Sequence, residues 1–253
     1  MEQSDNNNRP VVLVTGGGRR IGACVCRAFG AAGWRVAVHC GRSLQAAGEV
    51  AESIGGGRAA VFSADLRDDR ERDGVIPAVL ERFGRIDVLV NNASAYVRRP
   101  LSAVSAQTLR EDLEINFTAP FALMCSFREA AGSAGGNIVN ILDSRIQWPD
   151  GDSAGYSLAK SALAQGTLLC AREWAAAGIR VNGIAPGFVM PAEGVPMERM
   201  AHLVEASPLK RRCTPEEIAD SALWLVNAPS VTGQIIYLDG GLHLPAGGKG
   251  EKV

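Results

Sequence analysis

The feature that most constrains the fold of this chain is a repeated alternation of short apolar runs with longer segments of helical periodicity. The apolar runs are rich in β-branched residues and bounded by turn-forming residues, so each is predicted to be a strand. The expected strands are residues 11–14, 35–38, 59–62, 86–90, 136–142, 179–184 and 234–238. Strands and helices alternating in this order wind into a doubly wound parallel sheet with helices on both faces, so an α/β fold is predicted.

The glycine-rich loop after the first expected strand predicts a phosphate site. It reads TGGGRRIG over residues 15–22 and leads into a helix expected from Ile21 to Ala32. A helix N-terminus with its free N–H groups favours the pyrophosphate of a dinucleotide at that place. Arg20 stands where such a loop normally keeps its middle glycine. Its side chain could reach a ligand beside the cofactor; the alternative is a surface arginine in a loop that has drifted.

Length and charge narrow the class of protein and of partner. A chain of 253 residues with 47% hydrophobic content can bury one substantial core, so a single domain is expected over residues 10–245. The polar residues 1–9 and the glycine- and charge-rich residues 246–253 are expected to be flexible tails. The formal net charge of -1 gives no electrostatic reason to expect nucleic acid or an anionic membrane as partner, so the expected ligand is a small molecule.

The cysteines and the apolar runs bear on location. No cysteine pair has the CxxC spacing of a metal site or redox dithiol, so buried reduced thiols and no metal are expected. The cysteines are Cys24, Cys26, Cys40, Cys125, Cys170 and Cys213. No signal segment is recognisable, and no apolar run approaches the roughly 18 residues of a membrane helix. A cytoplasmic location is therefore expected.

Five separated motifs at the expected strand ends resemble those of the short-chain dehydrogenase/reductases, over about residues 10–244. The motifs are the glycine loop, Asp65-Leu66, Asn91-Asn92-Ala93-Ser94, Tyr156-Ser157-Leu158-Ala159-Lys160 and Pro186-Gly187. Their agreement makes the resemblance specific, whereas a lone glycine loop is weak. The resemblance implies a Rossmann-type fold, a nicotinamide cofactor and a homotetramer formed through helices of the kind that carries Tyr156.

Tyr156 and Lys160 are the expected centre of the chemistry. They lie four residues apart and so share one face of the expected helix. A cation at that distance lowers the pKa of a phenol, which would let Tyr156 act as an acid or base near neutral pH. Asn116 matches the family's helix asparagine that supports a water next to the lysine. Asp143 stands 13 residues before Tyr156, where most of the family has a serine.

Asp143 and Arg20 together resemble one branch of the family, the pteridine reductases. The glycine loop of that branch reads TGxxxRxG, and its catalytic set is Asp, Tyr and Lys. Ser94 and Tyr96 also resemble the branch, in which a serine and an aromatic after the NNA segment contact the pterin. A flat ring can stack between a nicotinamide and Tyr96. The residues expected to contact substrate are Arg20, Ser94, Tyr96, Asp143 and Tyr156. The alternatives are a local turn or cap for Asp143 and a core or interface aromatic for Tyr96.

The end of the second expected strand favours NADPH over NADH. It reads HCGRS over residues 39–43, without the acidic residue that holds the ribose hydroxyls of NAD and with Arg42 where a 2′-phosphate would lie. A solvated arginine is the alternative for Arg42. The segment resembles the HxxRS run of the pteridine reductases, in which this arginine, the serine and the basic residue at position 19 hold the phosphate. The expected cofactor-binding residues are Gly16, Arg19, Arg20, Ile21, His39, Arg42, Ser43, Asp65, Leu66, Asn92, Ala93, Ser94, Tyr156, Lys160, Pro186 and Gly187.

The resemblance implies hydride transfer from NADPH to a C=N bond of a dihydropteridine, giving the tetrahydro form. For a dihydropterin the proton would come from a water held by Arg20, and for an oxidised pterin from Asp143 and Tyr156. One alternative is a generic carbonyl reductase in which Ser144, shifted by one residue, polarises a ketone. Another is a non-catalytic NADPH-binding protein, against which the intact Tyr156, Lys160 and Asn116 argue.

Three segments around the expected site are less readable. Residues 188–208 are rich in Met, Pro, Glu and Ala and follow a strand end, so a partly helical flap over the substrate is predicted. They carry no code that separates dihydromonapterin, dihydrobiopterin and dihydrofolate. Arg98 and Arg99 could meet an acidic substrate tail, although a solvated pair is favoured. Residues 148–155 have no expected role.

Overall fold

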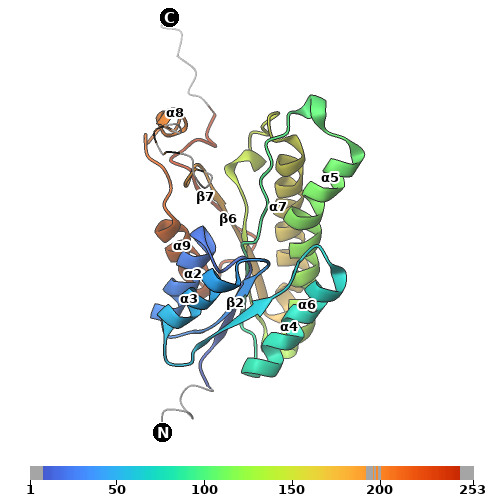
Figure 1. The fold of residues 1–253 in the computed structure, drawn as a ribbon, viewed down its shortest axis with the longest axis vertical. Helices are drawn as coiled ribbons and strands as arrows, with labels where there is room; N and C mark the ends of the chain where they lie inside the picture. The colour runs from blue at the N-terminus through green and yellow to red at the C-terminus, as the bar shows by residue number, and fades with distance from the viewer. Residues whose placement is uncertain (1–7, 192–195, 197, 199–200, 246–253) are drawn as a thin grey trace, which may run out of the picture.

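The seven runs predicted as strands all pair in parallel within one sheet, in the order β3-β2-β1-β4-β5-β6-β7 (Figure 1). The computed structural model describes residues 8–191, 196, 198 and 201–245. The strands are β1 Val11–Val14, β2 Arg35–Cys40, β3 Ala59–Ser63, β4 Val88–Asn91, β5 Gly136–Ile141, β6 Ile179–Pro186 and β7 Ile235–Leu238. Because β1 pairs with both β2 and β4, the strand order reverses beside β1, where ligands bind in sheets of this kind. The predicted Rossmann-type α/β fold is confirmed.

Helices cover both faces of the sheet. The helices are α2 Arg20–Ala31, α3 Leu44–Ile54, α4 Asp69–Phe83, α5 Ala106–Leu113, α6 Ala119–Ala131, α7 Ala154–Trp174, α8 Ala201–Glu205 and α9 Pro215–Asn227. Helices α2, α3 and α9 lie on one face, and α4, α6 and α7 lie on the other (Figure 1). No helix among the described residues is both long and apolar enough to cross a membrane.

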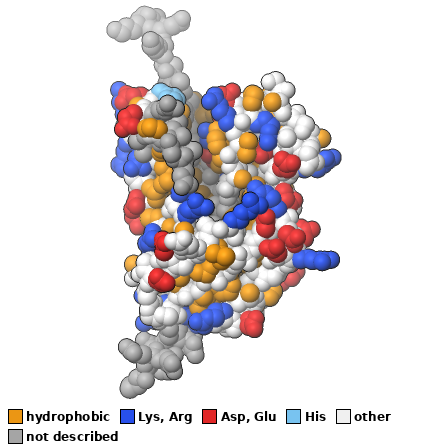
Figure 2. Space-filling model, viewed as in Figure 1, with side chains coloured by type: hydrophobic (Ala, Val, Ile, Leu, Met, Phe, Trp, Pro, Cys, Tyr) orange, Lys and Arg blue, Asp and Glu red, His pale blue; other side chains and the backbone are white. Residues whose placement is uncertain are grey.

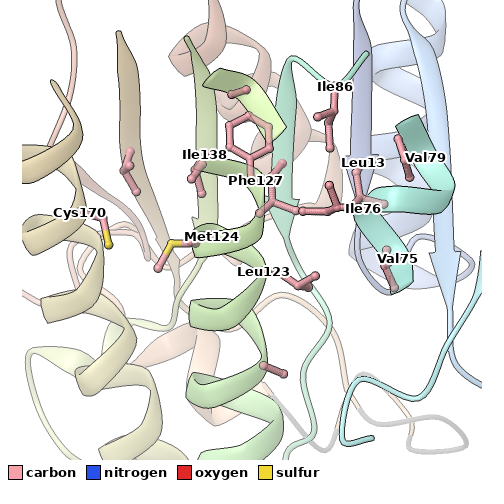
Figure 3. Packing of buried hydrophobic residues seen from close by; sticks show 14 of the residues in the cluster. Leu13, Val75, Ile76, Val79, Ile86, Leu123, Met124, Phe127, Ile138 and Cys170 are labelled. Carbon is pink, nitrogen blue, oxygen red and sulfur yellow. The ribbon is translucent and has the colours of Figure 1, made fainter. Parts of the chain in front are cut away.

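Two apolar cores hold these layers together, one on each face of the sheet. Because successive strand residues point to opposite faces, Leu13 joins the core under α4, α6 and α7, and Val12 joins the core under α2, α3 and α9. Figure 3 shows Phe127 and Met124 of α6 in the first of these cores, where Phe127 lies beside Ile138 of β5. All three side chains are fully buried, and burial of each stabilises the fold by about 2 kcal/mol.

Local sequence sets where α4 begins and ends. The carboxylate of Asp68 accepts hydrogen bonds from the backbone N–H groups of Arg70 and Glu71, at 2.9 and 3.1 Å, which satisfies two free donors of the first turn. At the other end, Gly84 adopts a left-handed conformation with φ of 75°, which terminates the helix. The helix is therefore fixed at both ends beside the sheet.

Parts of the sequence predictions fall outside the described residues. The expected tails lie there except for Asn8 and Arg9, as do residues 192–195, 197, 199 and 200 of the expected flap. The described part of that flap includes the short helix α8. All six cysteines are free; four are buried, as expected, whereas Cys24 and Cys125 are partly exposed. Among the described residues no group of His, Cys, Asp or Glu is arranged to hold a metal ion.

Candidate active site

A cavity of about 380 Å³ lies at the carboxyl ends of β1, β2, β3 and β4. Most of the residues predicted to bind the cofactor line it, namely Gly16, Arg19, Arg20, Ile21, His39, Ser43, Asp65, Leu66, Asn92, Ala93 and Ser94. An adjoining cavity is lined by Arg42 and shares Gly41, Asp65 and Arg67 with the first. Basic side chains gather across the middle of the face shown in Figure 2, at the level of the N-terminal ends of α2 and α3.

The glycine loop forms a tight cradle against the segment that follows β4. A Cβ atom on Gly22 would lie 2.2 Å from the carbonyl oxygen of Gly16, so a larger side chain cannot be accommodated without moving the loop. Gly16 itself has a φ of 63°, a conformation that favours glycine. The side-chain amide of Asn92 donates to the carbonyl oxygens of Thr15 and Gly16, at 2.8 and 3.2 Å, and ties the loop to β4. The backbone can therefore approach a phosphate closely.

His39 connects the glycine loop to the end of β3. Its Nδ1 accepts a hydrogen bond from the N–H of Gly16 at 3.2 Å, and its Nε2 donates to the carbonyl oxygen of Ala64 at 3.1 Å. Burial lowers the pKa of His39, and these two contacts suit the neutral ring. His39 therefore supports the floor of the cavity, and its contact with a cofactor stays a prediction.

Arg20 bridges the glycine loop and the start of the expected flap. Its guanidinium donates to the carbonyl oxygens of Pro191 and Met190, at 2.9 and 3.3 Å. The backbone of Arg20 has a φ of 53°, which costs a residue other than glycine on the order of 1 kcal/mol. That conformation explains why glycine suits this position in other loops. The strain is retained here together with a side chain that makes two long-range contacts.

Asp143 and Tyr156 meet at the carboxyl end of β5. The Tyr156 hydroxyl donates to Asp143 Oδ2 at 3.1 Å. Asp143 precedes a 3-10 turn, η4 Ser144–Ile146, and its Oδ1 accepts the backbone N–H of Arg145 at 2.9 Å. The ring of Tyr96 packs edge-on against the ring of Tyr156, with 5.1 Å between centroids, and Tyr96 is 51% exposed. Three of the residues expected to contact substrate are therefore side by side.

The electrostatics of Tyr156 differ from the expected direction. Burial, then the charge of Asp143 and its hydrogen bond, raise the pKa of Tyr156 well above its usual value. Lys160 is fully buried, which lowers its pKa to about 8, and its Nζ donates to the carbonyl oxygen of Ile141 at 2.7 Å. The expectation of a lowered pKa for Tyr156 is therefore wrong for this structure, because burial and the nearby carboxylate raise it, and the charge that opposes this rise is that of Arg145.

Asn116 lies in a π-helical turn, η2 Glu114–Thr118, between α5 and α6. Its Oδ1 accepts from the Ser94 hydroxyl at 2.7 Å and from the Ala95 N–H at 3.1 Å. Its Nδ2 donates to the carbonyl oxygens of Ala95 and Asp112, at 2.9 and 3.0 Å. The amide thus fixes the segment after β4, and the water expected beside Lys160 stays a prediction.

The Pro186-Gly187 turn lines neither of the two cavities. It lies at the end of β6 and is hydrogen-bonded to the end of β7. The N–H of Gly187 donates to the carbonyl oxygen of Leu238 at 3.0 Å. A Cβ atom on Gly187 would lie 2.8 Å from that of Asp239, so only glycine fits without a shift. The turn is therefore closely packed, and its contact with a cofactor stays a prediction.

Arg98 and Arg99 do not form a solvated pair. Arg98 is exposed and forms an ion pair with Asp152, whereas Arg99 is mostly buried, with 2.7 Å between its Nη1 and Asp112 Oδ2. A Cβ atom on Gly155 would lie 2.2 Å from the same oxygen, so Asp112 packs closely against the start of α7. The favoured interpretation is wrong for Arg99, because its buried partner comes from α5 and adjacent sequence does not reveal it.

Two arginines of the site were not anticipated. Arg67 lines both cavities and lies 3.8 Å from Asp65. Arg145 contacts Asp143, and the only sequence signal was an arginine two residues after an unusual acid. Residues 148–155 had no expected role. In this segment Trp148 Nε1 donates to the carbonyl oxygen of His243 at 2.9 Å, which links the segment to the residues that follow β7.

Comparisons with known proteins agree with this geometry. A family model described as enoyl-(acyl carrier protein) reductase matches residues 17–243. FolM alternative dihydrofolate reductase 1 from Brucella suis, solved in complex with NADP, is similar at a TM-score of 0.89 and 36% identity, over 95% of this chain and 97% of that chain. The 3-oxoacyl-[acyl-carrier-protein] reductase of Synechocystis sp. is 32% identical over 92% of this chain and 96% of its own length. Pteridine reductase 1 of Leishmania tarentolae is 30% identical over 93% of this chain and 96% of its own length.

Proposed function

The chain belongs to the short-chain dehydrogenase/reductase family of NAD(P)-dependent oxidoreductases, and from that premise we propose that it is an NADPH-dependent pteridine reductase. The proposed reaction converts a dihydropteridine to its tetrahydro form. The observation that carries the proposal is the hydrogen bond from Tyr156 to Asp143, since a carboxylate occupies the position at which most of the family has a serine hydroxyl.

The described residues fit a phosphorylated dinucleotide. Gly16 and Gly22 line the cavity, and because the loop packs closely on itself at Gly22, its backbone can face a pyrophosphate there. No acidic residue follows β2 to hold two ribose hydroxyls. Arg19, Arg42 and Ser43 would hold the 2′-phosphate of NADPH, since a guanidinium binds phosphate through paired charge-assisted bonds. When bound, NADPH supplies the hydride. NADP in the Brucella suis relative and in the other FolM structure, from Brucella canis, supports this choice.

The substrate side favours a heterocycle that bears N–H groups over a ketone. A ketone oxygen is activated by two donors, whereas Asp143 presents acceptor oxygens and would repel it. The amino and ring N–H groups of a pterin would instead donate to Asp143. Tyr96 offers an exposed ring against which a flat ligand can stack, and Arg20 and Ser94 line the adjacent wall.

Proton supply follows from the electrostatics of the site. Because its pKa is raised, Tyr156 carries its proton at neutral pH and can act directly as a general acid. Its hydroxyl must turn from Asp143 toward the substrate nitrogen to deliver that proton. A dihydropterin receives its proton at N5, and in this proposal a water held by Arg20 gives it. Tyr156 and Asp143 therefore matter most for a fully oxidised pterin.

A 3-oxoacyl reductase is the second candidate, since the Synechocystis relative has that name and matches nearly the whole chain. In that case Ser144 would have to act in place of the missing serine; it is buried within η4. NADPH oxidation measured with dihydropterins and with ketones separates the two. Turnover confined to dihydropterins supports the proposal, and turnover confined to ketones contradicts it.

Assembly is a further part of the proposal. Helix α7 carries Tyr156 and Lys160 on its buried face, and it exposes Leu158, Leu168 and Leu169. Exposed leucines on one helix favour a contact between copies of a chain. We propose a homotetramer formed through such helices, which the mass in solution tests.

A further inference from the structure

Arg145 contacts several of the side chains around Tyr156. Its Nη1 lies 3.0 Å from Asp143 Oδ2, and its Nε lies 3.3 Å from Asp150 Oδ2. Its guanidinium carbon lies 5.4 Å from the centroid of the Tyr96 ring. One guanidinium thus contacts two carboxylates and the aromatic ring proposed to stack on the substrate.

The contact with Asp143 involves the oxygen that Tyr156 also uses. Asp143 Oδ2 accepts from the Tyr156 hydroxyl at 3.1 Å and from Arg145 Nη1 at 3.0 Å. Both partners of that hydroxyl bond are largely buried: the Asp143 side chain is 14% exposed and Tyr156 is 7% exposed. A carboxylate in such a place needs a cation beside it, because an unpaired buried charge is strongly unfavourable.

We propose that Arg145 is a positioning residue of the proton relay, which holds the Asp143 carboxylate against the Tyr156 hydroxyl and balances its negative charge. The proposal rests on the proposed function only in making Tyr156 the proton donor. The sequence pattern made Lys160 the cation that lowers the pKa of Tyr156. The proposal gives this role to Arg145, which lies in η4.

The groups around Tyr156 support this division of roles. Asp143 faces it from the residue before η4 and Arg145 from η4 itself, Ser94 and Tyr96 from the segment after β4, and Lys160 from its own helix. The charge of Asp143 raises the pKa of Tyr156, whereas the charge of Arg145 and a hydrogen bond with Ser94 oppose that rise. Lys160 directs its ammonium at the carbonyl oxygen of Ile141, and its Nζ lies 5.8 Å from the centroid of the Tyr156 ring. Arg145 is therefore the cation best placed to act on the Asp143–Tyr156 pair.

A titration that needs no turnover tests the proposal. The three tyrosines are replaced throughout by 3,5-difluorotyrosine, whose phenol ionises at lower pH, and fluorine NMR follows each one after assignment with Tyr→Phe variants. We expect Arg145→Gln to raise the midpoint of Tyr156 by at least about one pH unit, a tenfold change in its ionisation constant. Arg145→Lys should recover part of that change, and Asp143→Asn should lower the midpoint.

A matched control separates this role from a general effect on the fold. Arg98→Gln removes the neighbouring exposed ion pair with Asp152 and should leave the midpoint of Tyr156 unchanged. An unchanged midpoint in Arg145→Gln, with NADPH affinity equal to that of the wild type, would overturn the proposal. If Arg145→Gln fails to fold, Arg145→Lys decides. Lysine keeps the positive charge but lacks the planar guanidinium that contacts Asp143, so the midpoint of Tyr156 should still rise measurably, and an unchanged midpoint would overturn the proposal.

Kinetics give a second readout and keep the two proposals apart. With a fully oxidised pterin, Arg145→Gln should lower kcat by about tenfold and leave the KM for NADPH unchanged, since the change acts on the proton donor. Loss of NADPH affinity in place of kcat would contradict a positioning role. If the wild type reduces no pterin, the proposed function fails while the fluorine titration still decides the role of Arg145.

Discussion

The carboxylate of Asp143 accepts a hydrogen bond from the Tyr156 hydroxyl, with 3.1 Å between Oδ2 and Oη, at the position where a serine donor is usual in this family. The exchange turns a donor into an acceptor and adds a negative charge beside the phenol. Burial raises the pKa of Tyr156 most, and the charge and the hydrogen bond of Asp143 raise it further, so the phenol stays protonated at neutral pH. The site is therefore arranged to give a proton and to receive N–H groups.

Removing the Tyr156 hydroxyl should separate the two proton routes. Tyr156→Phe keeps the ring that packs against Tyr96 and deletes only the proton donor. We expect kcat to fall by on the order of 100-fold for a fully oxidised pterin, as for the loss of a general acid, and by much less for a dihydropterin. Single-turnover rates with both substrates make the comparison; equal losses would show that one proton route serves both.

Lys160 should reduce the stability of the unliganded protein at neutral pH. Its pKa is lowered from 10.5 to about 8, so the folded protein binds fewer protons than the unfolded chain between these values, and stability rises with pH across that window. Lys160→Met should therefore raise the free energy of unfolding by about 2 kcal/mol at pH 7, after allowance for the lost bond to Ile141.

The pH dependence of that gain identifies its cause. Urea unfolding at pH 7 and at pH 10 should show the advantage of Lys160→Met shrinking as the lysine loses its charge. The same variant should lose most of its activity. A stability difference that does not change with pH would mean that packing, and not the buried charge, accounts for it.

The close approach at Gly22 should make the glycine loop intolerant of a methyl group. A Cβ atom there would lie 2.2 Å from the Gly16 carbonyl oxygen, so Gly22→Ala should cost about 2 kcal/mol and weaken NADPH binding strongly. Gly48→Ala is the matched control, since nothing lies within 4 Å of its Cβ position in α3. That variant should stabilise the protein by about 0.5–1 kcal/mol. Thermal unfolding and NADPH titration compare the two variants. Equal effects on stability and on NADPH affinity would contradict the claim that the loop has no space for a methyl group at Gly22.

Arg98 and Arg99 should differ sharply although they are neighbours. Arg99→Leu leaves the buried carboxylate of Asp112 unpaired, and we expect a loss of about 3 kcal/mol. Arg98→Leu removes an exposed pair with Asp152 and should change the stability little, because solvent screens exposed ion pairs. Adding Asp112→Asn to Arg99→Leu should recover part of the loss, because burial already raises the pKa of Asp112. Similar costs for both single variants would contradict the assigned burial.

The strands and the motifs at their ends were predictable because they depend on local pattern. All seven strands form where apolar runs indicated them, the glycine loop and Asn92 line one cavity at the carboxyl ends of the strands, and Tyr156 meets Asp143 just after β5. That much follows from parallel winding, which brings the carboxyl ends of strands to one edge.

Contacts between distant segments were not predictable in the same way. The pairing of Arg99 with Asp112, the bonds from Arg20 to residues 190 and 191, and the direction of the Tyr156 pKa all depend on how loops pack. Burial and the carboxylate of Asp143 decide that pKa; the spacing of the motifs indicated the carboxylate, but it does not encode how deeply the phenol is buried. Arg145 was missed for the same reason, since its significance lies in the oxygen it shares with Tyr156.

The most direct test is the rate of NADPH oxidation with dihydromonapterin, dihydrobiopterin, dihydrofolate and a panel of ketones, measured for the wild type and for Arg20→Gly. Because Arg20 has a φ of 53°, glycine relieves backbone strain there, which offsets the loss of the two exposed bonds to Pro191 and Met190, so the variant should be about as stable as the wild type. We predict turnover of a dihydropterin that Arg20→Gly abolishes, with ketones inert. Ketone turnover that survives or improves in Arg20→Gly would contradict the account and identify an ordinary carbonyl reductase.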